Sequence, residues 1–291
     1  MHFLRNTFEF LKEVYFKFNK HSGSLLAGGI AFFIFFSLFP LLLFSGIVLG
    51  FVLEDPAVQN QVMDFVLANF PALAGFIRDS IIIPLIDFRS IAGIIALLGF
   101  LWAGTNLFGG IAIGLNAVYE TAETRNILVQ KFVAIGVYLI IAALIFFSFS
   151  ATALATVFRD EILRLLFTGR VIVAVWTLFN TVLGIISSLL LFLIIYKLVP
   201  NVKLSFKSIL PGTLVAGLTW EIAKYGFAFY LNAFAREGYG LVYGGLASIV
   251  LLMFWLYISA VLLLLGADIN VVYGRRAMGG VKSFEPRKAS K

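Results

Sequence analysis

The chain has 291 residues, of which 61% are hydrophobic and 13% are charged, and its formal net charge is +7. A soluble domain is roughly 45–50% apolar and about 25% charged, so this composition excludes an ordinary soluble domain. The absence of cysteine excludes disulfides, thiolate metal sites and cysteine nucleophiles. Both histidines, His2 and His21, precede the first long apolar run, so we expect no catalytic or metal-binding histidine cluster inside the membrane.

Six apolar runs follow, and each is long enough for a helix that crosses a hydrocarbon core of about 30 Å. We place them at about 28–53, 90–118, 131–157, 171–198, 206–231 and 245–273. Pro40 and Pro211 lie inside runs and are the expected kink points, because proline removes a helix hydrogen bond. The expected fold class is all-α: a polytopic membrane domain over 1–273, followed by a short basic tail over 274–291.

The orientation follows from the distribution of lysine and arginine. Most of these residues lie in the segment before the first run, in the segments after the second and fourth runs, and in the tail. This bias predicts a bacterial inner-membrane protein with both termini in the cytoplasm. Basic flanks that face anionic lipid explain the net charge, so no nucleic-acid partner is expected.

Two amphipathic segments lie outside the six runs. Before the first run, apolar residues form one helical stripe: Leu4, Phe8, Leu11, Tyr15 and Phe18. Between the first two runs, a second stripe consists of Val58, Val62, Phe65, Val66 and Leu73. We expect an interfacial helix at the N-terminus and a second amphipathic helix on the outer side, which either lies on the bilayer or roofs a cavity.

Glu221 and Lys224 are the principal candidate site, because ionisable residues inside a span are costly. They lie three residues apart on one helical face, next to Trp220, and can pair with each other. One interpretation is a structural ion pair that faces the bundle interior. The other is a polar cavity near the midplane, below Pro211, like the broken-helix sites of secondary transporters.

For the other polar residues within the runs, a structural role is the simpler explanation: interfacial anchoring for Asp268 and Asn270, and helix packing for three amides. Asp268 and Asn270 form a polar cluster about one turn from the cytoplasmic end of the last run, where water and Arg275 or Arg276 can satisfy them. Three buried amides are expected to hydrogen-bond across helices or, alternatively, to line a cavity: Asn106, Asn116 and Asn180.

Glycine is frequent at two places. Gly110 and Gly114 have a spacing that permits close helix packing. The segment between the last two runs contains Gly238, Gly240, Gly244 and Gly245 together with two tyrosines, which suits either a re-entrant turn or hinge or a plain interfacial connection.

Short motifs of glycine, proline and aromatic residues recur along nearly the whole chain, and their order and spacing are specific in combination. They are Ser-Leu-Phe-Pro at 37–40, Gly-Leu-Asn-Ala-Val-Tyr at 114–119, Leu-Val-Pro-Asn at 198–201, Leu-Pro-Gly at 210–212, Tyr-Gly-Gly-Leu-Ala at 243–247, Trp-Leu-Tyr at 255–257 and Leu-Gly-Ala-Asp-Ile-Asn at 265–270. In these motifs the chain resembles the BrkB/YihY family of bacterial inner-membrane proteins. The family more usually has glutamate where this chain has Asp268, which keeps the charge.

The resemblance implies a six-span helical membrane bundle. Members of the family have been labelled as a tRNA-processing ribonuclease, and others have been linked to serum resistance or to transport across the envelope. A nuclease needs a metal–carboxylate cluster or a pair of histidines facing water, together with an RNA-binding face. Neither is found in this sequence, so we do not expect ribonuclease activity.

The residues favour a transport-class protein that moves or hands over an amphipathic molecule, such as a membrane lipid. No P-loop motif, metal site or cofactor site is present in the sequence. One alternative is a scaffold that recruits an envelope protein partner. Another is a membrane-embedded enzyme in which Ser37 is activated by Glu221 or Lys224. The substrate and the oligomeric state stay open.

Overall fold

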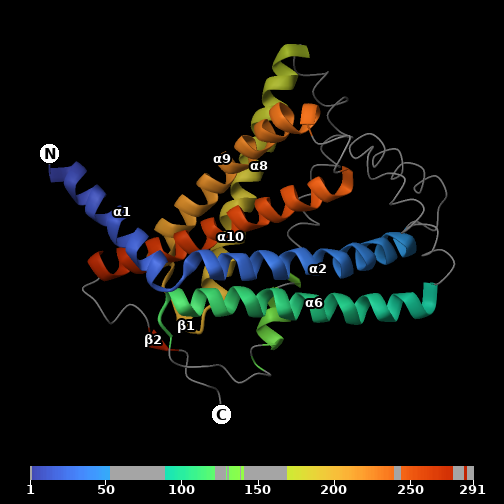
Figure 1. The fold of residues 1–291 in the computed structure, drawn as a ribbon, viewed down its shortest axis with the longest axis horizontal. Helices are drawn as coiled ribbons and strands as arrows, with labels where there is room; N and C mark the ends of the chain where they lie inside the picture. Colours follow the sequence, from blue (N-terminus) through green and yellow to red (C-terminus); the bar gives the residue numbers. More distant parts are fainter. Residues whose placement is uncertain are drawn as a thin grey trace. The chain divides into compact units, whose positions relative to one another are not determined.

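Five of the described helices overlap predicted apolar runs, and α1 overlaps the predicted interfacial segment. The structure is a computed structural model that describes residues 2–52, 89–121, 129, 131–137, 139–140, 169–238, 244–277 and 285–286. Its elements are α1 (His2–Lys20), α2 (Gly23–Val52), α6 (Arg89–Val118), α8 (Gly169–Leu198), β1 (Val202–Lys203), α9 (Phe206–Gly238), α10 (Gly244–Ala277) and β2 (Glu285–Pro286) (Figure 1). Apart from the two short strands, every one of these elements is helical, so the all-α class is confirmed for them.

Several helices extend beyond the predicted boundaries. The α2 helix begins at Gly23, α9 continues to Gly238, and α10 continues to Ala277. Pro40 and Pro211 lie inside helices that continue past them. The predicted outer amphipathic segment, most of the 131–157 run and the connection over 239–243 lie outside the described residues.

Among the described residues, four helical segments are long and apolar enough to cross a membrane. They are Gly23–Leu41, Leu97–Val118, Thr181–Leu198 and Ile249–Arg276. The α9 helix is not one of the four, and it carries Glu221 and Lys224 near its middle. The chain divides into two compact units, one of residues 1–32 and 108–291 and the other of residues 33–107. The candidate site lies in the first unit.

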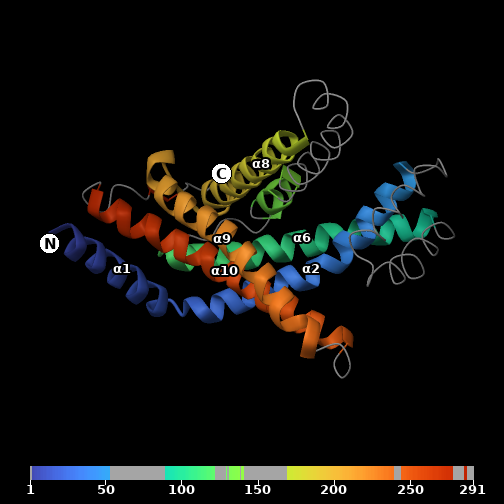
Figure 2. The same cartoon turned by 90° about the horizontal axis from the view of Figure 1, so that it is seen from above.

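In the first unit, α9 packs against both α8 and α10 (Figures 1 and 2). The contact with α10 is a direct backbone approach at Gly212 and Gly266. A Cβ atom added to Gly212 would overlap the Gly266 carbonyl oxygen, and one added to Gly266 would overlap the Tyr196 hydroxyl. Only residues without a side chain permit this approach.

Hydrogen bonds from three helices surround this glycine contact. The buried Asn270 side chain accepts the Gly212 N–H through Oδ1 at 2.7 Å. From α8, the Tyr196 hydroxyl donates to the Leu263 carbonyl oxygen of α10 at 2.7 Å. The contact therefore combines close packing with satisfied polar groups, as a low-dielectric environment requires.

The α1 helix presents three different faces. Phe10 and Val14 pack on α10 against Leu265, Ile269 and Val272. The neighbouring face leaves three apolar side chains exposed, namely Phe8, Leu11 and Tyr15. The third face carries charged residues. An apolar face left open beside a docked face is what an interfacial helix needs, and that part of the interpretation stays a prediction.

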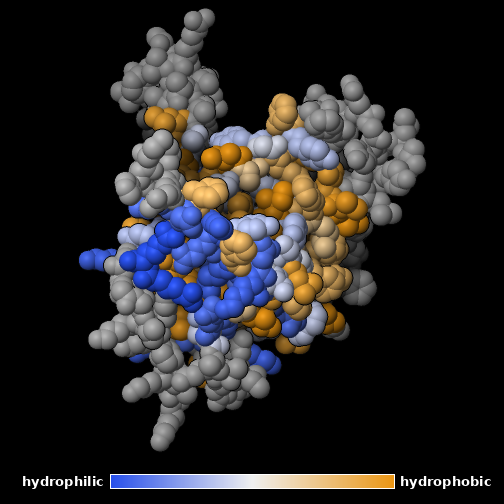
Figure 3. Space-filling view, turned by 60° about the vertical axis from the view of Figure 1, so that its left-hand side comes forward, coloured by the Kyte–Doolittle hydropathy of each residue, from blue (hydrophilic) through white to orange (hydrophobic). Residues whose placement is uncertain are grey.

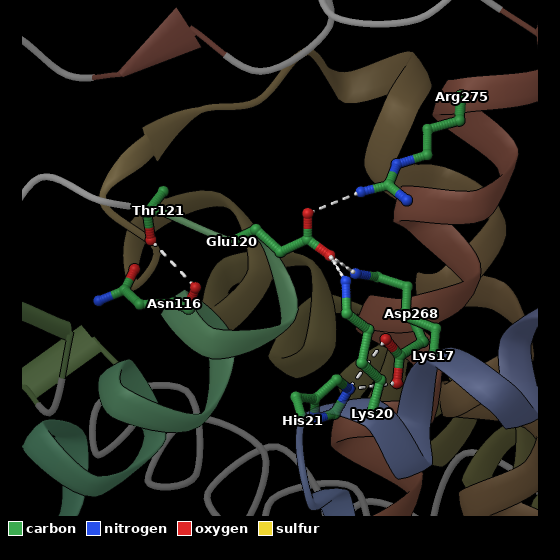
Figure 4. A network of polar contacts seen from close by, with 8 residues as sticks. All are labelled: Lys17, Lys20, His21, Asn116, Glu120, Thr121, Asp268 and Arg275. Atoms are coloured by element: carbon green, nitrogen blue, oxygen red, sulfur yellow. Dashed lines mark hydrogen bonds and ion pairs between the residues drawn. The ribbon is translucent and has the colours of Figure 1, made fainter.

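Ion pairs fasten α1 to the ends of two other helices (Figure 4). Glu120, just after α6, binds Lys17 at 3.0 Å, Lys20 at 3.7 Å and Arg275 at 3.0 Å. Arg276 binds Glu13 of α1 at 2.7 Å. Figure 3 looks toward the side on which α1 lies in Figure 1 and shows hydrophilic side chains gathered there.

Glu120 holds this position in an uncommon backbone conformation. Its φ is 52°, in the left-handed region where glycine usually ends a helix. The Thr121 N–H bonds to the Asn116 carbonyl and the Glu120 N–H bonds to the Ala117 carbonyl, which together form a Schellman cap on α6. A side chain in this conformation costs about 1–2 kcal/mol, which the three cationic partners help to offset.

The groups around Glu120 also change the pKa of its carboxyl group. The hydrogen bond from Lys17 lowers its pKa below the ordinary 4.5, and the charges of Lys17, Arg275 and Lys20 act in the same direction, while burial opposes them. A carboxyl whose pKa is lowered by folding stabilises the fold above its unfolded pKa. That stabilisation is lost as the pH falls through the lowered folded pKa.

The chain end forms a small pairing of its own. β2 pairs antiparallel with β1, with Val202 opposite Pro286 and Lys203 opposite Glu285. The segment predicted as a basic tail from 274 therefore begins as the last turn of α10 and includes this two-residue strand.

Replacing Gly212 by alanine is expected to lower the thermal stability of the purified protein. The added methyl group meets backbone on α10, so the helices must separate, at a cost of about 1–3 kcal/mol. Gly226→Ala in the same helix is the matched control, because no atom lies within 4 Å of a Cβ built there. Equal unfolding temperatures for the two variants would contradict the close approach.

Replacing Glu120 by glutamine is expected to lower stability at pH 7 by less than about 1 kcal/mol, because its ion pairs are partly exposed. The difference from wild type should shrink as the pH falls below about 4.5 and should vanish once the pH passes below the lowered pKa of Glu120 in the folded protein. Glu120→Gly should be less damaging than Glu120→Gln, because glycine relieves the positive φ. Melting curves across pH check this, with the exposed Glu9→Gln as control.

Candidate functional site

Glu221 and Lys224 form the predicted ion pair on α9. Lys224 Nζ lies 2.7 Å from Glu221 Oε1, one helical turn along the same face. From α8, Ser188 Oγ makes a short hydrogen bond to the same carboxylate oxygen and also lies 2.9 Å from the Gly184 carbonyl oxygen. A hydroxyl has one proton, so it donates to one of these oxygens at a time.

The two charges differ in accessibility. The Glu221 side chain is 11% exposed, whereas the Lys224 side chain is 37% exposed. The Lys224 ammonium also lies 4.7 Å from the centroid of the Trp220 ring, which is a cation–π distance. The pair therefore presents mainly its positive end to the surroundings, next to an indole face.

An aromatic cluster holds Trp220 in place. The ring centroid of Trp220 lies 6.0 Å from that of Trp255 and 6.2 Å from that of Phe192, and Trp255 stacks on Phe227 at 5.0 Å. The Trp220 Nε1–H donates to the Ser259 hydroxyl of α10 at 3.0 Å. Contacts from α8, α9 and α10 thus hold the Trp220 ring in place beside Lys224.

The surface around the pair is apolar. Ile222, Tyr225 and Phe229 on α9 are all exposed. The pair lies near the middle of α9, a helix about 50 Å long at 1.5 Å per residue, so a membrane-spanning α9 would place it far from bulk water. At that depth an unpaired ammonium is costly, and the Glu221 carboxylate lowers that cost for Lys224.

Two other predicted site residues of the first unit, Pro211 and Asn116, make no contact with this pair among the described residues. Pro211 precedes Glu221 by nearly three turns of α9. Asn116 Oδ1 accepts the Asn201 N–H at 2.9 Å, which joins the end of α6 to the residue after Pro200. The side chain of Asn180 lies outside the described residues.

Three of the predicted residues belong to the second unit, over residues 33–107. They are Ser37, Pro40 and Asn106. The Ser37 hydroxyl donates to the Ile34 carbonyl oxygen of its own helix at 2.7 Å. Pro40 packs beside Gly99, with 3.6 Å between the Pro40 Cβ and a Cβ built on the glycine. These contacts are structural.

Among the predicted hinge glycines, Gly238 ends α9, and Gly244 and Gly245 begin α10. Gly240 lies outside the described residues. The re-entrant turn stays a prediction.

The partners predicted for Asp268 were wrong. Arg275 binds Glu120 and Arg276 binds Glu13, because α10 continues as a helix through both arginines and directs them to α6 and α1. Asp268 is fully buried, and its two carboxylate oxygens lie 3.0 and 3.1 Å from His21 Nε2 (Figure 4). The Asp268 carboxylate is therefore paired with a side chain of the protein, His21.

Sequence reasoning missed His21, because it precedes the first apolar run. The turn after α1, in which Ser22 has a φ of 55°, brings the imidazole back to α10. The available signal was chemical: a buried carboxylate needs a donor, and few unassigned donors precede α2. In the part of the chain that the structure describes, no group of three or more His, Cys, Asp or Glu side chains could hold a metal ion.

Comparisons with known proteins agree on the membrane class. The family model described as "Virulence factor BrkB" matches residues 14–291. The chain is 30% identical to the "Putative ribonuclease-like protein YfkH" of Bacillus subtilis over 92% of this chain and 96% of that protein. It is also 30% identical to a "UPF0761 membrane protein" of Vibrio atlanticus over 86% of this chain and 77% of that protein.

A third relative, a UPF0761 membrane protein of Alteromonas mediterranea, is 25% identical over 92% of this chain and 88% of its own length. No solved structure matches the chain. Because the family model spans nearly the whole sequence and the relatives are covered over most of their length, the chain belongs to the BrkB family of membrane proteins.

Proposed function

We propose that the protein is a six-span inner-membrane protein with both termini in the cytoplasm, and that it moves or hands over a membrane lipid along α8, α9 and α10. The Glu221–Lys224 pair contacts the polar part of the substrate. Apolar side chains beside it, including Ile222 and Phe229, contact the acyl chains.

The observation that carries the proposal is the unequal exposure of an ion pair in the middle of α9, where the Lys224 side chain is 37% exposed and the Glu221 side chain is 11% exposed. A purely structural ion pair would be expected to bury both charges equally, since an exposed charge within hydrocarbon gains nothing for packing. Here the Glu221 side chain is nearly buried and bonded by Ser188, whereas the Lys224 side chain is partly exposed. That asymmetry suits a site that receives a ligand.

An envelope scaffold is the rival function. The names of the relatives support a membrane protein and not a particular activity, and the ribonuclease-like name belongs to one of them. A scaffold would use the surface of the protein and would not need a polar group within the membrane.

A double variant separates the two functions. Glu221→Leu with Lys224→Met replaces the pair by apolar side chains, which removes both charges without leaving one unpaired. In proteoliposomes that carry a fluorescent phospholipid, we expect transfer between leaflets to fall to the rate of protein-free vesicles while the protein stays folded.

The matched control replaces another ion pair of the same chain, Glu13 and Arg276, by leucine and methionine, and it should keep transfer. Full transfer by the Glu221/Lys224 variant would refute the proposed site. If wild-type protein moves no lipid but the Glu221/Lys224 variant still supports growth under envelope stress, the scaffold is favoured.

A further inference from the structure

The Glu221–Lys224 pair has one hydrogen-bond acceptor and further N–H donors that its contacts among the described residues do not use. Glu221 Oε1 is occupied by Lys224 and Ser188, whereas no hydrogen bond from the described residues reaches Oε2. Oε2 faces α8 at Gly184, where it lies 3.8 Å from the position of a built Cβ. Lys224 has three N–H donors, of which one is directed to Oε1.

Charge balance selects among ligands for these open groups. The pair is neutral as a whole when both residues are ionised. A purely anionic headgroup would leave a net negative charge at membrane depth, and a purely cationic one would leave a net positive charge. A zwitterionic headgroup leaves the site neutral and satisfies the open donor and the open acceptor together.

The chemistry of the cation narrows the choice further. Glu221 Oε2 needs an N–H donor, which a primary ammonium has and a trimethylammonium lacks. A trimethylammonium could instead bind aromatic faces. Here Lys224 lies over Trp220, and Phe227 stacks on Trp255, so these faces are already in use.

Building on the proposed function, we propose that the Glu221–Lys224 pair binds the headgroup of a phospholipid that carries both a phosphate and a primary ammonium, as in phosphatidylethanolamine. Lys224 Nζ donates to the phosphate oxygens. The lipid ammonium donates to Glu221 Oε2. Ser188 keeps the carboxylate in place through Oε1.

Native mass spectrometry of the full-length protein tests the selectivity directly. The detergent-purified protein is offered equal amounts of phosphatidylethanolamine, phosphatidylglycerol and phosphatidylcholine with identical acyl chains. We expect phosphatidylethanolamine to be retained about tenfold better than either, the effect of one charge-assisted hydrogen bond. Equal retention, or preference for phosphatidylglycerol, overturns the proposal.

Variants test whether the preference for phosphatidylethanolamine depends on the Glu221–Lys224 pair. Glu221→Gln, which keeps the size of the side chain, should abolish the preference over phosphatidylglycerol. Exchanging the charges by Glu221→Lys with Lys224→Glu should restore part of it, because the site is again neutral. Glu13→Gln, at the distant ion pair, should leave it intact. A preference that survives Glu221→Gln contradicts the assignment.

A soluble competitor distinguishes a lipid from its free headgroup. Excess phosphoethanolamine should not displace the bound lipid, since the acyl chains contribute on the apolar surface of α9. Complete displacement would show that the headgroup alone is the ligand. If the protein transfers lipid without headgroup selectivity, this inference is refuted and the proposed function stands. If the protein binds phosphatidylethanolamine selectively but transfers no lipid, the proposed function is refuted and this inference stands.

Discussion

The backbone contact between α9 and α10 at Gly212 and Gly266 sets the positions of the polar groups around it. Because the two backbones touch there, Asn270 can accept the Gly212 N–H and Tyr196 can reach across from α8. Roughly two turns further along α9, the same packing sets Trp220 opposite Ser259 of α10. The site at Glu221 and Lys224 therefore depends on a place where no side chain fits.

The ion pairs of the protein lie in two environments that differ in their exposure to solvent. Around α1, the pairs of Glu120 and Glu13 are partly exposed, and each contributes little because solvent screens it. The Asp268–His21 pair and the Glu221–Lys224 pair lie deeper, where an unpaired charge is strongly unfavourable. Asp268 is buried completely, but Lys224 stays open. The two deeper pairs therefore differ in exposure, with the Asp268 side chain fully buried and the Lys224 side chain partly exposed.

Much of the fold could be predicted from sequence. Uncharged runs of about 30 residues define α2 and α6, and Glu221 and Lys224 are paired because residues three apart share a helical face. The Asp268–His21 pair could not be predicted, because helical periodicity does not show that a turn brings two residues together across 247 positions. Likewise, the role of Ser188 depends on the packing of α8, which no local pattern encodes.

The placement of α1 has a consequence for biosynthesis. This helix is made well before the α10 residues that hold it, because Asp268 and Arg276 lie 247 and 263 positions after His21 and Glu13. Contacts so distant in sequence form late in folding. Until α10 is inserted, His21 lacks Asp268 and Glu13 lacks Arg276, so α1 can complete its docking only after α10 has been made and inserted.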